Sequence, residues 1–326
     1  MQKKLLFIHQ GAIGDIVSLF PAIIKLKAKF NRIDAFCNKD LGNLACLLKI
    51  TNRTYPVEAA FFSSIFSDKV DPVAKEILRS YDEILLFSYS DQIEKTISGI
   101  VNKRIYRIPP RPDATIEIHI LDYILKFLVK YKLTDNDSLP GKEYHDYLTK
   151  EIGNSKAQDT GSKVIIHPGS GSRRKNWPVA NFIKVCKNLE SKGISIDIII
   201  GPAEYDLAEK FKSYLPSSTK IHSPAKLLDI VPLLKQSSGF IGNDSGISHL
   251  AAFMGIPAIV IFGPSDPKRW KPFGPFVKIL RSQTECNPCF ETGKTDCKDI
   301  KCLDGVTPEI VLNTLYFSML KHDIAP

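Results

Sequence analysis

The stretch that decides the fold comprises residues 239–274 and reads GFIGNDSGISHLAAFMGIPAIVIFGPSDPKRWKPFG. After an apolar start, the polar turn at residues 242–246 precedes apolar side chains that recur at helical spacing as far as Met254. Gly255 and Pro257 then end the predicted helix, because glycine often follows the last helical turn and proline cannot continue it. The pattern therefore predicts a strand, a turn and a helix in succession.

A second polar turn follows the next predicted strand, the fully apolar run at residues 258–262. Both turns lie at carboxyl ends of strands, where ligands bind in open α/β sheets. The first turn also begins a helix, whose unpaired backbone N–H groups and positive dipole attract anions. Asp244 and Ser245 are equally typical of simple helix N-caps. The two turns and the nearby His249 together favour an anion site.

These residues also carry a family resemblance. G-N-D-S-G-x-x-H-L-A-A, followed by F-G-P-S-D-P-x-R-W-x-P-F-G, resembles the heptosyltransferases of glycosyltransferase family 9, which build the inner core of bacterial lipopolysaccharide from ADP-heptose. The resemblance implies donor-site positions at Asp244, Ser245, Gly246 and His249. His249 near the donor diphosphate suits stabilisation of the leaving group.

Composition places the chain among ordinary globular proteins. Its 326 residues suit two domains, with 44% hydrophobic and 24% charged residues. The net charge of +9 suits a polyanionic substrate or an anionic membrane surface, and no nucleic-acid-binding motif accompanies it. No apolar run reaches the roughly 18 residues of a membrane span, so we expect a cytoplasmic protein.

The N-terminal segment predicts a buried strand, a glycine-containing loop and a helix over residues 15–30. Asp15, at the end of the loop, has two interpretations. One is a first-turn carboxylate that stabilises the helix dipole. The other is a general base for glycosyl transfer to a hydroxyl. The resemblance favours the second, because G-A-I-G-D-I-V is similar to the family motif whose Asp is the proposed catalytic base.

The rest of the first half predicts further strands, among them residues 83–87, and an amphipathic helix over 116–133. His119 in that helix is either structural or acceptor-binding. A cationic stretch precedes the helix and is either solvated surface or a contact to acceptor phosphates or carboxylates. Its members are Lys103, Arg104, Arg107 and Arg111.

Residues 135–162 have turn and linker composition, so we place the domain boundary there and predict domains at 1–155 and 156–326. The second begins with H-P-G-S-G-S-x-x-K-x-W-P, in which small residues admit a phosphate and a lysine neutralises it. This stretch is similar to the family's second motif. The resemblance implies that Ser170 and Gly171 lie near the diphosphate and that Lys175 pairs with it.

Glu204 follows a later predicted strand and is either a first-turn carboxylate or, as the resemblance implies, a ligand of the donor nucleoside. Near the C-terminus, four cysteines have the spacing C-x2-C-x7-C-x4-C. A structural zinc or iron site, free thiols and disulfides all remain open for this set, which comprises Cys286, Cys289, Cys297 and Cys302.

We therefore predict an α/β protein of two Rossmann-like, doubly wound domains. The resemblance implies the GT-B fold, with the two domains facing each other across a cleft. It also implies an N-terminal acceptor domain, a C-terminal donor domain and inverting transfer that needs no metal. The expected partners are an ADP-sugar and an anionic glycolipid at the inner face of the cytoplasmic membrane. Another nucleotide-sugar or acceptor, and a non-catalytic relative, are the alternatives; a dehydrogenase is disfavoured because G-x-G-x-x-G is missing.

Overall fold

A computed structural model of the chain divides into two compact units, Met1–Ile152 and Gly153–Pro326. The residues it describes are 3–67, 69–153, 162–284, 286, 288–291, 297 and 301–322. The predicted domain boundary between residues 155 and 156 lies outside the described residues.

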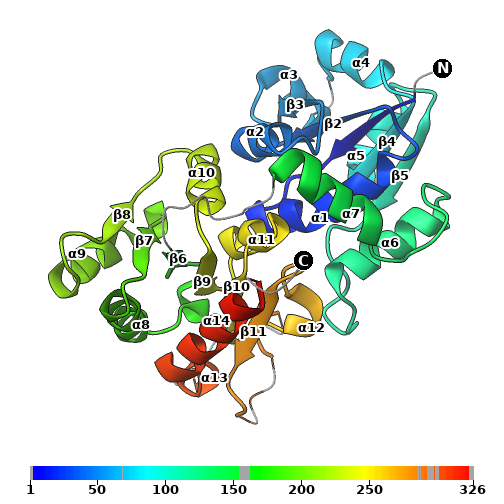
Figure 1. Ribbon diagram of the computed structural model, residues 1–326. Coiled ribbons are helices and arrows are strands. Elements are labelled where there is room, and N and C mark those ends of the chain that lie inside the picture. The colour runs from blue at the N-terminus through cyan, green and yellow to red at the C-terminus, as the bar shows by residue number, and fades with distance from the viewer. Residues whose placement is uncertain are drawn as a thin grey trace. The chain divides into compact units, whose positions relative to one another are not determined.

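The first unit is built on a five-stranded parallel sheet with the order β3-β2-β1-β4-β5 (Figure 1). The predicted strand at 83–87 is confirmed as β4. The strands are β1 (Lys4–Ile8), β2 (Arg32–Cys37), β3 (Arg53–Pro56), β4 (Glu83–Phe87) and β5 (Arg104–Ile108).

Helices connect these strands, as expected for parallel pairs, which need a crossover between them. The α-helices are α1 (Ile13–Leu26), α2 (Lys39–Leu47), α3 (Ala60–Ser63), α4 (Pro72–Arg79), α5 (Asp91–Ser98), α6 (Ile120–Lys130) and α7 (Gly141–Tyr147). Short 3-10 and π turns follow at Ser64–Phe66 and Leu148–Ile152. In Figure 1, α6 and α7 lie beside α1, and both contact it.

Both faces of this first sheet are buried. Leu6 and Ile8 of β1 pack on one face with Leu78 of α4 and Ile97 of α5. Phe7 lies between Leu6 and Ile8 in sequence, so its side chain points to the opposite face, where it is equally buried. Continuous apolar strands of this kind are what a sheet covered on both sides requires.

The second unit contains a six-stranded parallel sheet with the order β11-β10-β9-β6-β7-β8. Isoleucines from alternate positions of β6, β7, β9 and β10 pack with α8 and α14 on one face. The strands are β6 (Lys163–His167), β7 (Ser195–Ile199), β8 (Lys220–His222), β9 (Gly239–Asn243), β10 (Ala258–Phe262) and β11 (Val277–Arg281).

The helices of this unit complete a second doubly wound fold (Figure 1). They are α8 (Val179–Ser191), α9 (Tyr205–Tyr214), α10 (Ile230–Lys235), α11 (Gly246–Phe253), α12 (Pro267–Trp270), α13 (Lys301–Asp304) and α14 (Pro308–His322). Short 3-10 turns stand at Arg173–Lys175, Pro202–Glu204 and Leu227–Asp229. Gly255 has a φ of 78° just after α11, which confirms it as the residue that ends this helix.

Three sequence predictions were wrong in detail. The predicted helix at 15–30 ends at Leu26, because the backbone N–H groups that follow turn back onto Ile24, Lys25 and Leu26. The helix predicted over 116–133 begins only at Ile120. Residues 135–162 are not uniformly irregular, since α7 and the π turn lie within them and bury two tyrosines, Tyr144 and Tyr147.

The strand order places the loops that carry the predicted site residues at one edge of each sheet. In the first sheet the chain leaves β1 toward β2 on one side, and β4 lies on the other. In the second, β6 stands in the same way between β7 and β9. Such switch points are where open α/β sheets bind ligands, in the crevice beyond the carboxyl ends of the strands. Asp15 follows β1, and Ser170 follows β6.

Among the described residues, the longest helices are either too short or too polar to cross a bilayer.

Candidate active site

Asp15 lies in the first turn of α1, directly beyond the end of β1. Its Oδ2 accepts a hydrogen bond of 3.0 Å from the backbone N–H of Ala12, the residue that precedes the helix. The carboxylate therefore caps the helix and satisfies one of its unpaired donors. The side chain is 12% exposed. The structural interpretation of Asp15 is thus correct, and it leaves room for a chemical role.

Arg111 reaches the same carboxylate from the loop after β5. Its Nε donates to Oδ1 at 3.1 Å and its Nη2 donates to Oδ2 at 2.8 Å, a two-bond ion pair. In the sequence, Arg111 stands out only as part of a cationic stretch. Its pairing with Asp15 was missed because the two residues are 96 positions apart.

His9 is a buried residue near this ion pair. Its Nδ1 accepts a hydrogen bond of 2.8 Å from the backbone N–H of Gly11, and its ring packs against Phe87 at 5.2 Å. Burial lowers the pKa of His9 to about 4, while the nearby Asp15 acts to raise it and Arg111 to lower it. His9 is therefore neutral at physiological pH and holds the loop as a hydrogen-bond acceptor.

Gly11 has no room for a side chain. A Cβ there would lie 2.3 Å from Cε1 of His9 and 2.7 Å from Cβ of Asp15. The glycine thus allows the loop to bring the imidazole and the carboxylate close together.

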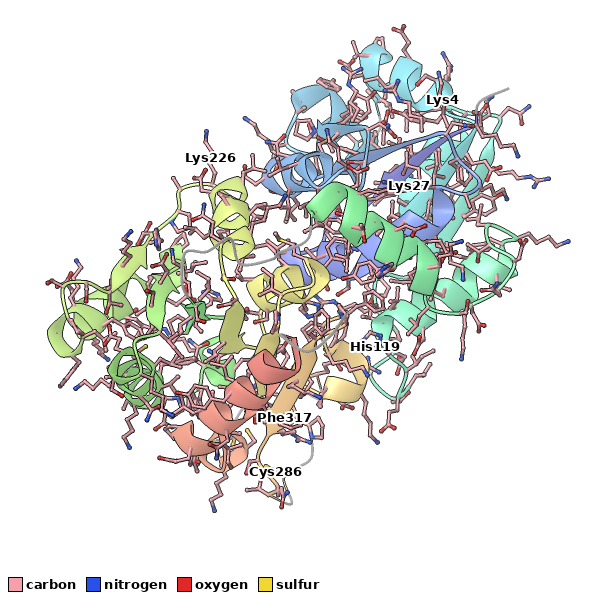
Figure 2. The ribbon with its side chains drawn as sticks, in the orientation of Figure 1. Lys4, Lys27, His119, Lys226, Cys286 and Phe317 are labelled. Atoms are coloured by element: carbon pink, nitrogen blue, oxygen red, sulfur yellow. The ribbon has the colours of Figure 1, made fainter. Side chains whose placement is uncertain are left out.

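Arg107 and His119 each bond to neighbouring residues of the first unit. Arg107 pairs with two carboxylates of α5, with Asp91 at 2.5 Å and with Glu94 at 2.7 Å. Nδ1 of His119 accepts from the backbone N–H of Leu121 at 3.3 Å, so this histidine is the N-cap of α6 (Figure 2). Helix capping is a structural role, as one of the two interpretations of His119 expected.

In the second unit, the loop after β6 carries Ser170, Gly171 and Lys175. The hydroxyl of Ser170 lies 2.6 Å from the carbonyl of Ser172 and 2.7 Å from Oδ1 of Asn176, which fixes the shape of the loop. A Cβ on Gly171 would meet nothing within 4 Å. The fold itself therefore does not require glycine at this exposed position.

Lys175 and Asp244 form an ion pair between the loop after β6 and the loop after β9. Nζ lies 2.7 Å from Oδ2, with the lysine side chain 18% exposed and the aspartate side chain 5% exposed. The structure thus brings together two residues that the sequence predicted for one site. Asp244 is not the N-cap of α11, because its carboxylate serves Lys175 instead.

Ser245 is the N-cap of α11, and its hydroxyl accepts from the backbone N–H of Ser248 at 3.3 Å. Gly246 is the first helical residue, and His249 follows within the first turn, where it is buried. The positive end of the helix dipole therefore points to the loop that holds Asp244. A group with negative charge is favoured at this end of α11.

Asn243 joins the two motifs and was missed by the sequence analysis. Its fully buried amide donates to the carbonyl of Pro168 at 2.7 Å and accepts from the backbone N–H of Trp177 at 3.0 Å. The indole N–H of Trp177 donates to the carbonyl of Val306 at 2.9 Å. Trp177 is thus a packing residue. The Asn in G-N-D-S-G was the available signal.

Glu204 lies against the start of the same loop. A Cβ on Gly169 would stand 2.3 Å from its Cδ, and a Cβ on Gly201 would stand 2.6 Å from its Oε2. Burial raises the pKa of this carboxyl, while hydrogen bonds from the backbone of Ser170 and Gly201 act to lower it. The two glycines leave the space that the carboxylate of Glu204 occupies.

Phe290 is a second residue that the sequence analysis missed. Nζ of Lys175 lies 4.2 Å from the centroid of its ring, within the range of a cation–π interaction. The backbone N–H groups of Cys289 and Phe290 both donate to the carbonyl of Pro264, at 2.9 and 3.0 Å. Nη2 of Arg174 lies 3.6 Å from Sγ of Cys289. Cys289 and Phe290 therefore contact the loop after β6 and the loop after β10.

The four late cysteines do not form a metal site as they stand. All are free thiols, and the part of the chain described here holds no group of three or more His, Cys, Asp or Glu placed to bind an ion. Burial raises the pKa of Cys302, and the neighbouring thiols Cys286, Cys289 and Cys297 raise it further. Cys286 lies in the segment after β11 (Figure 2).

The two sites have complementary chemistry. The first unit presents a carboxylate beside a guanidinium and a neutral imidazole. The second presents a lysine, a helix N-terminus and a loop of small residues, which suit a diphosphate. Glycosyl transfer from a nucleotide-sugar needs a group that can take a proton and a place for a diphosphate.

The sequence matches the family model described as glycosyltransferase family 9 (heptosyltransferase) over residues 124–298. Among curated proteins, the chain is 23% identical to lipooligosaccharide heptosyltransferase 2 of Campylobacter jejuni, over 95% of this chain and 98% of that protein. It is 24% identical to lipooligosaccharide heptosyltransferase 2 of Haemophilus influenzae, over 43% of this chain and 42% of the relative. The alignments with three of the curated heptosyltransferases span half or less of the length of each relative.

Solved structures share the fold over almost the whole chain. The family 9 glycosyltransferase of Veillonella parvula superposes with a TM-score of 0.75 at 16% identity, covering 98% of both chains. Escherichia coli ADP-heptose lipopolysaccharide heptosyltransferase II gives 0.71 at 18% identity, over 98% of this chain and 99% of that one. The iron-containing heptosyltransferase TibC gives 0.60 at 15% identity, over 98% and 76%.

Two parallel α/β sheets and these neighbours establish the predicted GT-B fold. The family model covers more than half of the chain. Its match includes both motifs of the second unit, at residues 167–178 and 239–274. The chain therefore belongs to glycosyltransferase family 9, the heptosyltransferase family.

Proposed function

We propose that this protein is an inverting glycosyltransferase that moves a heptose, or a related sugar, from an ADP-sugar to the lipopolysaccharide inner core or a similar glycan. The ion pair of Lys175 with Asp244 at the start of α11 carries this proposal. A lysine, a helix N-terminus and a glycine loop meet there, as a diphosphate requires. Relatives named as heptosyltransferases, one solved with ADP, support the same donor.

In the proposed reaction, Asp15 takes the proton of an acceptor hydroxyl as its oxygen attacks the anomeric carbon. The new C–O bond forms as the bond to the diphosphate breaks, and ADP leaves with the electron pair. Lys175, Ser170, the N–H groups of Ser245 and Gly246, and His249 stabilise the charge that develops on ADP. Glu204 binds the donor nucleoside, and Gly171 allows close approach of the diphosphate.

Asp15 lies in the first unit, and the residues proposed to bind the diphosphate lie in the second. We propose that the first unit binds the acceptor and that the second binds the nucleotide-sugar. The displacement itself needs no cofactor. With a net charge of +9, the protein suits an anionic glycolipid acceptor at the inner face of the cytoplasmic membrane. Sedimentation with anionic and neutral lipid vesicles tests that location, and equal recovery from both would contradict it.

Calorimetry with ADP and ADP-heptose tests the function, with the wild type beside Lys175→Ala and Asp15→Asn. We expect ADP to bind, Lys175→Ala to weaken binding by at least tenfold (about 1.4 kcal/mol) and Asp15→Asn to leave it unchanged. Transfer to a glycolipid acceptor should be lost in Asp15→Asn, because an amide cannot take the proton. Binding of another nucleotide-sugar instead would support the alternative donor. Full binding without any transfer would identify a non-catalytic relative.

A structural zinc or iron at Cys286, Cys289, Cys297 and Cys302 remains a proposal. The solved TibC neighbours are described as iron-containing. The thiols of Cys286, Cys289 and Cys297 all act to raise the pKa of Cys302. Metal analysis of the purified protein decides this, since one ion per chain supports the site and a content far below one contradicts it.

A further inference from the structure

Both oxygens of the Asp15 carboxylate accept hydrogen bonds in this structure. Oδ1 accepts from Nε of Arg111, and Oδ2 accepts from both Nη2 of Arg111 and the backbone N–H of Ala12. A general base must have an oxygen within hydrogen-bond reach of the hydroxyl it deprotonates. The guanidinium therefore competes with an acceptor hydroxyl for both carboxylate oxygens.

Arg111 is the more accessible partner of the pair. Its side chain is 51% exposed, whereas that of Asp15 is 12% exposed. A ligand from solvent therefore meets the guanidinium before it meets the carboxylate. The planar fork of an arginine binds a carboxylate or a phosphate group equally well through two parallel hydrogen bonds. An incoming acid can thus replace Asp15 without leaving the cation unpaired.

The neighbouring loop supports a sugar site around Arg111. Tyr89, from the loop after β4, donates its hydroxyl to the backbone carbonyl of Arg111 at 3.3 Å. Tyr89 is 65% exposed. β4 lies between β1 and β5 in the sheet, so the loops with Asp15, Tyr89 and Arg111 share one edge. An exposed aromatic face beside a cation suits an acidic sugar, which presents an apolar ring face and a charge.

We propose that Arg111 is the receptor for an acidic group of the acceptor, a carboxylate or a phosphate, and that this group displaces the carboxylate of Asp15 and so frees the base. The proposal rests on the proposed function, because Asp15 is the base of that reaction. Until an acidic acceptor arrives, the ion pair keeps the base from activating water. Arg111 thereby couples recognition of the acceptor's charge to the availability of the base.

Binding to the complete chain tests the exchange without any need for transfer. The Nε–H signal of Arg111, in protein labelled with ¹⁵N-arginine and assigned with Arg111→Lys, is followed by NMR. The probes are methyl glucuronide, glucose 6-phosphate and the uncharged methyl glucoside. We expect the signal to shift with an acidic probe and not with methyl glucoside. The acid that shifts it more strongly identifies a carboxylate or a phosphate as the preferred group.

Asp15→Asn supplies the decisive comparison, because the amide no longer competes for the guanidinium. The acidic probe should bind this variant several-fold more tightly than it binds the wild type. Arg79→Gln is the matched control, since Arg79 precedes β4, at the opposite edge of the sheet, and its Nε donates to the backbone carbonyl of Ile100 at 3.1 Å. It should leave the affinity unchanged. Equal shifts with all three probes, or no gain in affinity in Asp15→Asn, would overturn the proposal.

Kinetics then separate this role from a purely structural one. In Arg111→Gln, KM for an acidic acceptor should rise by about tenfold or more, while KM for the same acceptor with its acid reduced to an alcohol stays constant. Hydrolysis of the ADP-sugar without acceptor should become several-fold faster. A fall in kcat that is equal for both acceptors, with KM unchanged, would show that Arg111 merely holds Asp15 in place. If the acid displaces Asp15 but no acceptor is glycosylated, the proposed function fails together with the role of the exchange in freeing a base, and only the binding of an acid at Arg111 stands.

Discussion

Nζ of Lys175 lies 2.7 Å from Oδ2 of Asp244, although the two residues are 69 positions apart in the sequence. Both side chains are largely buried, so the pair is screened less by solvent than a surface ion pair. The lysine must therefore be shared between this carboxylate and any diphosphate that binds. Like Asp15 in the first unit, Lys175 is held by an opposite charge in the absence of ligand.

Asp244→Asn should increase the affinity for ADP, because Lys175 then keeps its full charge for the diphosphate. We expect a gain of roughly threefold to tenfold, which corresponds to about 0.7–1.4 kcal/mol. Calorimetry with ADP measures it. A loss of ADP affinity in this variant would show that the carboxylate itself contacts the nucleotide.

Lys175→Met should lower stability by about 2 kcal/mol, since it leaves a buried carboxylate without its partner. The double variant Lys175→Met with Asp244→Asn should recover most of that stability but none of the ADP binding. Urea unfolding of the four proteins forms a complete cycle. Additive effects on stability would contradict a direct interaction between the two side chains.

Gly169→Ala and Gly171→Ala should behave in opposite ways, although both lie in one loop. The new methyl group at 169 meets the carboxylate of Glu204, and we expect a loss of about 1–3 kcal/mol of stability together with weaker ADP binding. The methyl group at 171 meets open space. That variant should keep the stability of the wild type and lose ADP affinity only, as measured by thermal unfolding and calorimetry. Unchanged ADP affinity in Gly171→Ala would place the diphosphate elsewhere.

Phe290→Leu should weaken ADP binding although Phe290 was not predicted as a donor-site residue. The substitution removes the ring that supports Lys175, a contribution of about 0.5–1 kcal/mol, which corresponds to roughly a twofold to fivefold loss of affinity. Tyr214→Leu is the matched control, because it removes a more exposed cation–π pair with Lys187. ADP titrations of both variants check this. An equal effect of the two substitutions would argue against a local role for Phe290.

Acid should destabilise the first unit through His9. Its pKa is lowered by burial from 6.5 to about 4 in the folded protein, so the unfolded chain takes up a proton first as the pH falls. The stability from neutral His9 is therefore complete above about pH 6.5 and is lost as the pH falls toward 4. The loss is on the order of 3 kcal/mol.

His9→Asn isolates this effect, because the asparagine oxygen replaces Nδ1 as the acceptor for the N–H of Gly11. Urea unfolding at pH 7 and pH 4.5 should show a smaller loss of stability in the variant than in the wild type. His167 is also buried, and its lowered pKa contributes equally to both proteins. Identical pH dependence of the two would assign the acid sensitivity to other groups.

Much of the fold could be predicted from local patterns. The apolar run at 258–262 and the Gly255–Pro257 stop predicted a strand and a helix end that the structure confirms. Helix ends were less predictable. The helix predicted from residue 116 begins at Ile120 because His119 caps it, and capping by a histidine carries little signal in sequence.

The sequence by itself determined the fold class and the chemical types in the site, because periodicity and the glycine and proline stops are local properties of the chain. It also determined that a carboxylate, a lysine and a helix N-terminus follow strand ends. Only the tertiary structure decided the partners: Arg111 for Asp15, Asp244 for Lys175, and Phe290 beneath that lysine. Parallel strand order creates these pairs, since it places loops from distant parts of the sequence at one edge of a sheet.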